Sequence, residues 1–279
     1  MKINLFSLSQ RPAPIRLGCF ILSLLLPWLP YAAAVYITVK DDENTRTILT
    51  MGILAVEFLF LLPWWSKYIH QQTPAFRHYG LEFTRKNGVE LLRGVAIGLI
   101  SILVLFALQG IFGWLVFQQP SFSMVQLVLE GLLTGLGVAF AEELFFRGFI
   151  YDELQRDYNS KSVVWATAII FAVLHFIKPL PVIISTSPQF LGLVLLGLAC
   201  VWAKRSCRGR LGLSIGLHGG LVWGNYILEV GKLIKYSGTV PQWVTGVNNN
   251  PLAGVMGLLS LLLLALWMRQ KQLTVNSKQ

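Results

Sequence analysis

The feature that most constrains this chain is a group of three charged residues inside a largely apolar stretch. Glu142, Glu143 and Arg147 lie within residues 124–151, whose other side chains are mostly hydrophobic. A charged side chain at the centre of a lipid bilayer costs about 2.5–3.5 kcal/mol on insertion scales, and such residues usually mark a functional site. We therefore expect the site of this protein to be built around this stretch.

The composition is that of a membrane protein. Hydrophobic residues make up 54% of the 279 residues and charged residues only 13%, against about 25% charged residues in soluble proteins. In a soluble domain the net charge of +10 would suggest nucleic acid as a partner, but here the basic residues lie between apolar runs. That pattern is typical of a topology signal and of contact with anionic lipid, so we expect membrane lipid and no nucleic acid as a partner.

Apolar runs long enough to cross a bilayer predict the fold class. We expect an all-α protein, a polytopic membrane helix bundle with about eight transmembrane helices in one integral membrane domain over residues 1–279. The three cysteines have no metal or disulfide spacing and are expected to be free thiols. The eight runs are residues 17–38, 48–65, 94–117, the run from 124, the run that holds His175, residues 190–203, the run from 211 and residues 252–268.

Lys and Arg are distributed unevenly between the connections. Of the 23 basic residues, 17 lie in the N-terminal segment, in alternate connections and in the C-terminal tail. Basic residues favour the cytoplasmic side of a membrane. This predicts an even number of spans in a plasma or internal membrane, with both termini in the cytoplasm.

The spacing of the charged residues predicts different roles for the two glutamates. Glu143 and Arg147 are four apart, which favours an ion pair on one helical face. Glu142 is turned about 100° away and has no basic residue three or four positions from it. His175 and His218, each in an apolar run, are its candidate partners. One carboxylate and two imidazoles can activate a water molecule for hydrolysis, with or without a metal ion.

The depth of these residues in the membrane tests this grouping. If the helix with Glu142 ended at Tyr151 and the helix with His175 ended at Lys178, the two side chains would lie more than about 10 Å apart along the membrane normal, at 1.5 Å per residue. They would meet only if the first helix continued towards Asp157 and the second passed through, or broke at, the prolines that follow His175. The hypothesis therefore requires a long fourth helix.

At these residues the chain resembles the intramembrane proteases that process CAAX proteins and bacteriocins, the CPBP or Abi family. The first motif of that family, EExxxR, is met at residues 142–147, and the second, FxxxH, at residues 171–175. The third motif places a histidine on a later helix, as His218 does. The resemblance covers about residues 125–230, which we take as the catalytic core.

The chain departs from the family pattern after His218. The family usually has Asn or Asp four positions later, where this chain has Val222. The nearest amide is Asn225, seven positions after His218 and on the same helical face. Asn225 is therefore a candidate supporting residue, and the departure puts support of the bound oxyanion in doubt.

The resemblance implies an eight-helix bundle that hydrolyses peptide bonds in membrane-tethered peptides or proteins. It makes Glu142 the general base and His175 and His218 the residues that bind the water, the oxyanion or a metal. It gives Glu143 and Arg147 a supporting, structural role. The family is described both as zinc-type and as metal-free glutamate-type.

Zinc remains open from the sequence. Glu142, His175 and His218 could form a zinc site with water as the fourth ligand. The HExxH helix that places zinc ligands and base together is absent. The sequence therefore slightly favours no cofactor over zinc.

Three other functions compete with peptide hydrolysis by Glu142. A catalytically silent scaffold or immunity protein of the same family is favoured by Val222. A proton-coupled transporter would use the carboxylates as a relay, but no pair of discontinuous helices in matching halves of the chain is apparent. Residues 212–216 fit the GxSxG pattern of serine hydrolases, yet they open an apolar helix instead of the strand-turn-helix that this motif requires.

Overall fold

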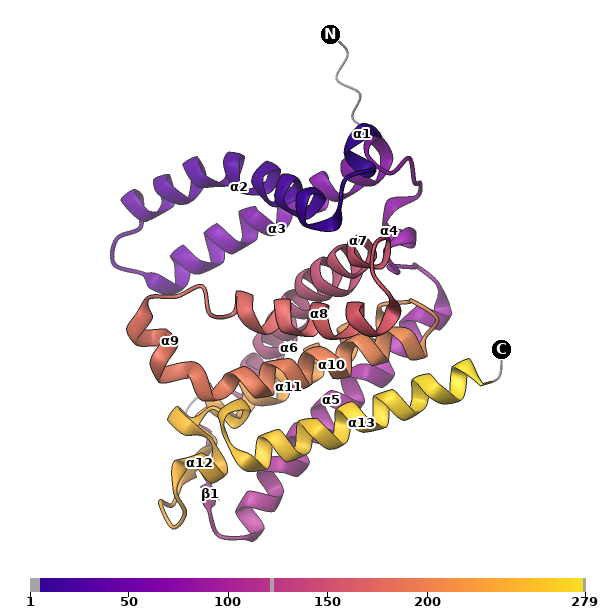
Figure 1. The fold of residues 1–279 in the computed structure, drawn as a ribbon. Coiled ribbons are helices and arrows are strands. Elements are labelled where there is room, and N and C mark those ends of the chain that lie inside the picture. Colours follow the sequence, from indigo (N-terminus) through magenta and orange to yellow (C-terminus); the bar gives the residue numbers. More distant parts are fainter. Residues whose placement is uncertain (1–5, 121–122, 278–279) are drawn as a thin grey trace. The chain divides into compact units, whose positions relative to one another are not determined.

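A computed structural model describes residues 6–120 and 123–277 of the chain. Apart from two short strands, these residues form helices and connecting segments (Figure 1), so the predicted all-α class is confirmed. The chain divides into two compact units. Unit 1 holds the described residues up to Tyr79 together with Asp152–Tyr158, and unit 2 holds the remainder. The predicted single membrane domain over residues 1–279, with a core at about 125–230, stays a prediction.

Unit 1 is built on two long helices, α2 (Ala13–Thr38) and α3 (Glu43–Tyr68), which pack side by side. Asp42 caps the start of α3 by accepting a hydrogen bond from the backbone of Thr45 (2.9 Å), which satisfies one of the free N–H groups of the first turn. The short helices α1 (Phe6–Ser9), α4 (Ala75–His78) and α7 (Tyr151–Gln155) complete the described elements around them.

A buried carboxylate joins several parts of unit 1. Glu153 Oε2 accepts a hydrogen bond from Arg16 Nε at 2.6 Å. Its Oε1 atom accepts one from Trp65 Nε1 at 3.0 Å and lies 2.5 Å from His70 Nε2. Arg16 and Glu153 are both fully buried. A buried charge is tolerated only when it is paired and hydrogen-bonded, as Glu153 is here.

Unit 2 contains the remaining long helices. α11 packs against α5, α6 and α10, and α10 packs against α8 and α13. The elements are α5 (Arg85–Ile111), β1 (Leu115–Phe117), α6 (Met124–Glu143), the π-helix η1 (Leu144–Ile150), the first residue of α7, α8 (Ser160–Leu174), α9 (Leu180–Thr186), η2 (Ser187–Gln189), α10 (Phe190–Ser206), α11 (Gly212–Glu229), β2 (Ile234–Tyr236), α12 (Gln242–Thr245), η3 (Val247–Asn249), η4 (Pro251–Ala253) and α13 (Val255–Asn276).

Glycines allow α5 and α11 to approach closely. A Cβ atom added at Gly216 would overlap the backbone oxygen of Leu91, and one added at Gly220 would overlap that of Val95. Small residues at helix interfaces bring two backbones together in this way. The close contact fixes the position of α11, the helix that carries His218.

Every predicted run contains a helix, and the protein is an integral membrane protein by the length and apolar character of these helices. Among the described residues, five helices are long and apolar enough to span a bilayer, and α8 is a shorter apolar helix. The seventh and eighth runs correspond to α11 and α13. The five are Ala13–Thr38, Glu43–Tyr68, Arg85–Ile111, Met124–Gln155 and Leu180–Ser206.

The end of the third run was predicted wrongly. The sequence extended this run to residue 117, but α5 ends at Ile111 and residues 115–117 form strand β1, antiparallel to β2. Between them Gly113 adopts a φ of +72°, a left-handed conformation that glycine adopts without steric cost and that turns the chain out of the helix. Apolar composition alone does not distinguish a helix from a short strand.

Candidate active site

The two adjacent glutamates lie at the end of α6, where the helix changes its winding. The helix continues without interruption from Met124 to Gln155, but Leu144–Ile150 form a π-helix. Short π-helical segments within α-helices occur frequently at functional sites. The long fourth helix that the sequence required is therefore present.

Glu143 is fully buried and both of its carboxylate oxygens are occupied. Oε1 accepts a hydrogen bond from Arg147 Nη1 at 2.8 Å, which confirms the predicted ion pair, and lies 2.9 Å from His218 Nδ1. Oε2 accepts a hydrogen bond from the Ser214 hydroxyl. Glu143 thus has no free oxygen with which to act on a water molecule.

Arg147 is held from several sides and is also fully buried. Its Nη2 atom donates to the Gly197 carbonyl oxygen at 3.2 Å, and its guanidinium lies 4.4 Å from the centre of the Phe171 ring. The Lys204 ammonium donates to the backbone oxygen of Arg147 at 2.5 Å. This network joins the π-helical turn to α8 and α10.

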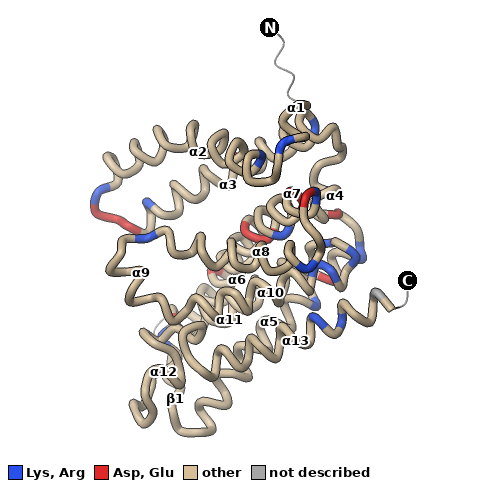
Figure 2. Tube along the Cα trace, in the orientation of Figure 1, with Lys and Arg blue, Asp and Glu red and all other residues tan. Residues whose placement is uncertain are grey.

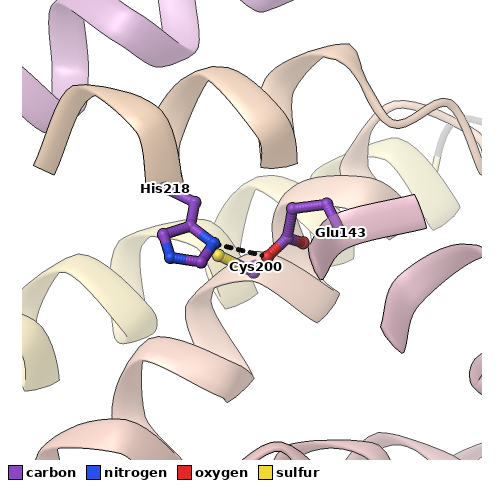
Figure 3. A group of neighbouring side chains, drawn as sticks. All are labelled: Glu143, Cys200 and His218. Carbon is purple, nitrogen blue, oxygen red and sulfur yellow. Dashed lines mark hydrogen bonds and ion pairs between the residues drawn. The ribbon is translucent and has the colours of Figure 1, made fainter. Parts of the chain in front are cut away.

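The contact with Glu143 determines how His218 is oriented (Figure 3). A carboxylate accepts hydrogen bonds, so Nδ1 of His218 carries the proton that it donates to Glu143. When the imidazole is neutral, its Nε2 atom therefore keeps a lone pair. That atom lies 3.9 Å from Glu142 Oε2.

His175 is oriented in the same way by the backbone. It caps the end of α8, and its Nδ1 atom lies 2.7 Å from the carbonyl oxygen of Phe171. A carbonyl oxygen can only accept, so Nδ1 again carries the proton and Nε2 has the free lone pair. Nε2 of His175 lies 3.9 Å from Glu142 Oε1. The helix ends before Pro179, and α9 begins after it.

Glu142 is the residue on which the two histidines converge. Its side chain is 29% exposed, and its Oε2 atom is buried without a hydrogen-bond partner. A separation of 3.9 Å is too long for a direct hydrogen bond. It leaves room for a bridging water molecule or a metal ion between carboxylate and imidazole. The structure therefore brings together Glu142, His175 and His218, as the sequence predicted, and gives the two glutamates different surroundings.

A second group of potential metal ligands lies beside this one. In the part of the chain that the structure describes, Glu143, Cys200 and His218 have ligand atoms within 4.8 Å of one another (Figure 3). This group does not fit a metal ion, because Glu143 is already bonded to Arg147 and Ser214. His218 also turns its protonated nitrogen towards it. The chemistry of the donors favours Glu142 with the two Nε2 atoms instead.

Asn225 and Val222, which follow His218 on α11, line an apolar cavity of about 160 Å³ together with side chains of α5, α10 and α13. Oδ1 of Asn225 is buried without a partner. No hydrogen bond joins Asn225 to Glu142, His175 or His218 among the described residues. Its supporting role stays a prediction.

Sequence reasoning assigned no supporting role to three residues that hold the site. Ser214 bonds to Glu143, Phe171 supports both Arg147 and His175, and Lys204 bonds to the backbone of Arg147. Ser214 and Phe171 each lie four positions before a histidine, so they share its helical face. This spacing was a usable signal. The position of Lys204 depends on the packing of α10 against the π-helical turn and left no signal in the sequence.

Comparison with known proteins agrees with the motifs. Residues 124–224 match the sequence model of a family described as type II CAAX prenyl endopeptidase, Rce1-like. No curated protein and no solved structure matches the chain. The matched region includes Glu142, His175 and His218. Residues 124–224 are thus similar to the Rce1-like family of CAAX prenyl endopeptidases, in agreement with the resemblance to CAAX-processing proteases.

Proposed function

We propose that this protein is an intramembrane endopeptidase that hydrolyses a peptide bond in a membrane-tethered peptide or protein. The observation that supports this most directly is the convergence of two Nε2 lone pairs on the Glu142 carboxylate, at 3.9 Å from each histidine. The similarity of residues 124–224 to a CAAX prenyl endopeptidase family supports the same reaction class.

In the proposed reaction, a water molecule between Glu142 and the histidines attacks the carbonyl carbon of the substrate. Glu142 takes a proton from the water as the new C–O bond forms, and donates that proton to the leaving nitrogen as the C–N bond breaks. His175 and His218 position the water by accepting hydrogen bonds from it through their Nε2 lone pairs. Glu143 and Arg147 hold His218 in its orientation and do not exchange protons with the substrate.

Zinc would fit at the same three side chains. Glu142 and the Nε2 atoms of His175 and His218 are ligand types that zinc takes, with water in the open position. A bound zinc ion would lower the pKa of that water and polarise the scissile carbonyl. The roles of Glu143 and Arg147 are the same with or without it. The chain has no HExxH helix to place zinc ligands and base together, and we propose the metal-free form as the resting form of the enzyme.

The placement in the membrane is part of the proposal. We propose that the protein lies in the plasma membrane or an internal membrane. The distribution of basic residues favours an orientation with both termini in the cytoplasm. A substrate tethered to the membrane would then reach Glu142 from within the bilayer or from its cytoplasmic face. The family description makes prenylated peptides the first substrates to test.

One observation favours a silent member of the family. Val222 stands where the family usually has Asn or Asp, and Val222 lines the apolar cavity and offers no donor for an oxyanion. A scaffold or immunity protein would keep the network around Glu143 for stability and would not turn over peptides.

The experiment compares peptide cleavage by the purified wild type with three variants: Glu142→Gln, His175→Asn and Glu130→Gln. Glu130 is exposed on the same helix and serves as the control. Membrane-anchored peptides with and without a prenyl group are used, and bound metal is measured on the same samples. Loss of cleavage in the first two variants only, without stoichiometric metal, supports the metal-free peptidase.

Two results would change the assignment. Zinc bound to the wild type and lost from Glu142→Gln and His175→Asn would assign the three side chains to a metal site. A folded wild type that cleaves none of the peptides would favour the silent scaffold, and Val222→Asn is then the variant in which to look for activity. Proton-linked solute uptake into vesicles would favour the transporter.

A further inference from the structure

A polar pocket of about 520 Å³ lies in unit 2, away from the candidate active site. Helices α5 and α13 form its two long walls, and the end of α10 and the start of α11 close it. Its lining is Glu90, Arg93, Ser206, Cys207, Leu213, Trp267, Gln270, Lys271, Thr274 and Val275. Hydroxyl and amide groups therefore lie beside two cationic side chains in one recess.

Two positive charges of this pocket have no acidic partner in the part of the chain that the structure describes. Glu90 forms a two-pronged ion pair with Arg210, with Arg210 Nε to Oε2 at 2.8 Å and Nη2 to Oε1 at 2.5 Å. No acidic side chain of the described residues lies within ion-pair distance of Arg93 or Lys271. Lys271 lies 4.7 Å from the Trp267 ring, which leaves its ammonium free to bind an anion.

The surroundings extend this positive potential. A second recess of about 490 Å³ shares Glu90 and Arg93 with the pocket and adds Arg85 and Lys86. Figure 2 shows Lys and Arg gathered where α5 begins, where α10 gives way to α11 and where α13 ends. By the distribution of charge, this is the end of unit 2 that faces the cytoplasm.

The apolar part of the pocket indicates what the anion is attached to. α5 is a candidate membrane span that begins with these basic residues, and α13 is apolar from Val255 to Met268 before its own basic residues begin. Trp267 stands at this change from apolar to polar, as aromatic residues do at the membrane interface. A ligand held here has its charged group at the level of the lipid headgroups and its apolar part alongside α13.

We propose that this pocket binds the phosphate headgroup of an anionic phospholipid. Arg93 and Lys271 would pair with the phosphate, and the Gln270 amide would donate a hydrogen bond to it or to the polar substituent of the headgroup. The Ser206 and Thr274 hydroxyls already donate to backbone carbonyl oxygens and complete the polar wall. Basic recesses between membrane helices on the cytoplasmic side recognise lipid headgroups in this way. The site is independent of the proposed peptidase, because it shares no side chain with Glu142, His175 or His218.

The test measures lipid binding by the purified full-length chain in detergent. Phosphatidylglycerol, phosphatidylcholine and inorganic phosphate are added in separate titrations. Native mass spectrometry measures how many molecules of each bind to the protein. The pocket variant is Arg93→Gln with Lys271→Gln, and the matched control is Lys178→Gln with Lys235→Gln. All four replaced residues are exposed, and each pair of changes removes two positive charges.

We expect phosphatidylglycerol to bind the wild type and the control with equal affinity and the pocket variant roughly 30-fold more weakly. Each lost cation removes about 1 kcal/mol of attraction to an anionic headgroup, and two of them correspond to this change in affinity. As a second readout, bound phosphatidylglycerol should slow alkylation of Cys207, a residue of the pocket wall. Equal affinity for the pocket variant, or equal binding of phosphatidylcholine and phosphatidylglycerol, would overturn the proposal. Displacement of the lipid by millimolar phosphate would assign the pocket to a free anion instead.

Discussion

Nδ1 of His218 lies 2.9 Å from Oε1 of Glu143, and this single contact separates the roles of two adjacent glutamates. With Nδ1 held by Glu143, the Nε2 atom of His218 faces Glu142. Glu143 is buried and fully bonded, whereas Glu142 is 29% exposed and has an oxygen without a partner.

Replacing Glu142 by Gln should abolish most of the peptide cleavage without unfolding the protein. A general base contributes about 10²–10⁴-fold to the rate, and Gln keeps the size of the side chain while removing the base. The measurement is the cleavage rate at saturating substrate, with thermal unfolding in detergent as the check of folding. Glu130→Gln, on the exposed face of the same helix, should cleave at the wild-type rate. Similar rates in both variants would exclude Glu142 as the base.

Replacing Glu143 by Gln should destabilise the protein instead. Arg147 would keep its buried charge without a carboxylate partner, and breaking a buried ion pair costs about 3–5 kcal/mol. Thermal unfolding in detergent measures the effect. The double change Glu143→Gln with Arg147→Met removes both charges and should recover part of the lost stability. A single variant as stable as the wild type would show that the pair contributes little.

Replacing Ser214 by Ala should lower stability modestly and leave the chemistry in place. Its hydroxyl donates to Glu143, and a hydrogen bond to a charged group is worth about 1.5–3 kcal/mol. Ser214 is fully buried, so it is not placed to attack a substrate. Cleavage should persist in Ser214→Ala, and serine-directed phosphonates should not inhibit the wild type. Complete loss of cleavage in a folded Ser214→Ala protein would revive the serine mechanism.

Replacing Gly216 by Ala should disturb the site through the packing of α11. The new methyl group would meet the backbone oxygen of Leu91 on α5, and overpacking of this kind costs about 1–3 kcal/mol. The displaced helix carries His218, so cleavage should fall together with the unfolding temperature. Gly88→Ala, on α5, has open space around the added Cβ atom and should leave both unchanged or raise the stability slightly.

Cys207 should react slowly with thiol reagents at neutral pH. Burial raises the pKa of its thiol to about 11, and the thiolate is the reactive form. Because the pKa lies above the experimental range, the alkylation rate should increase about tenfold for each pH unit between pH 7 and pH 9. Mass spectrometry of the peptide that contains Cys207 gives the rate. A plateau near pH 8.5 would mean that the thiol has an ordinary pKa and is open to solvent.

The spacing of residues along single helices predicted much of the site. The four-residue interval between Glu143 and Arg147 predicted their ion pair, and the depth of Glu142 and His175 required the long helix that runs to Gln155. These predictions succeeded because helix geometry is set by the backbone and places residues on a common face whatever surrounds them. The class of the fold followed from hydrophobic runs for the same reason.

Tertiary packing decided the rest. The sequence could not show that Glu143 would bond to His218 and Ser214, because these residues meet only when α6 and α11 pack together. The end of α5 at Ile111 depends on a glycine turn and on a partner strand more than 100 residues later in the chain. The orientation of each imidazole likewise depends on which acceptor the fold brings to Nδ1. Local spacing therefore determined which residues share a helical face, and the fold determined which of them have a free lone pair.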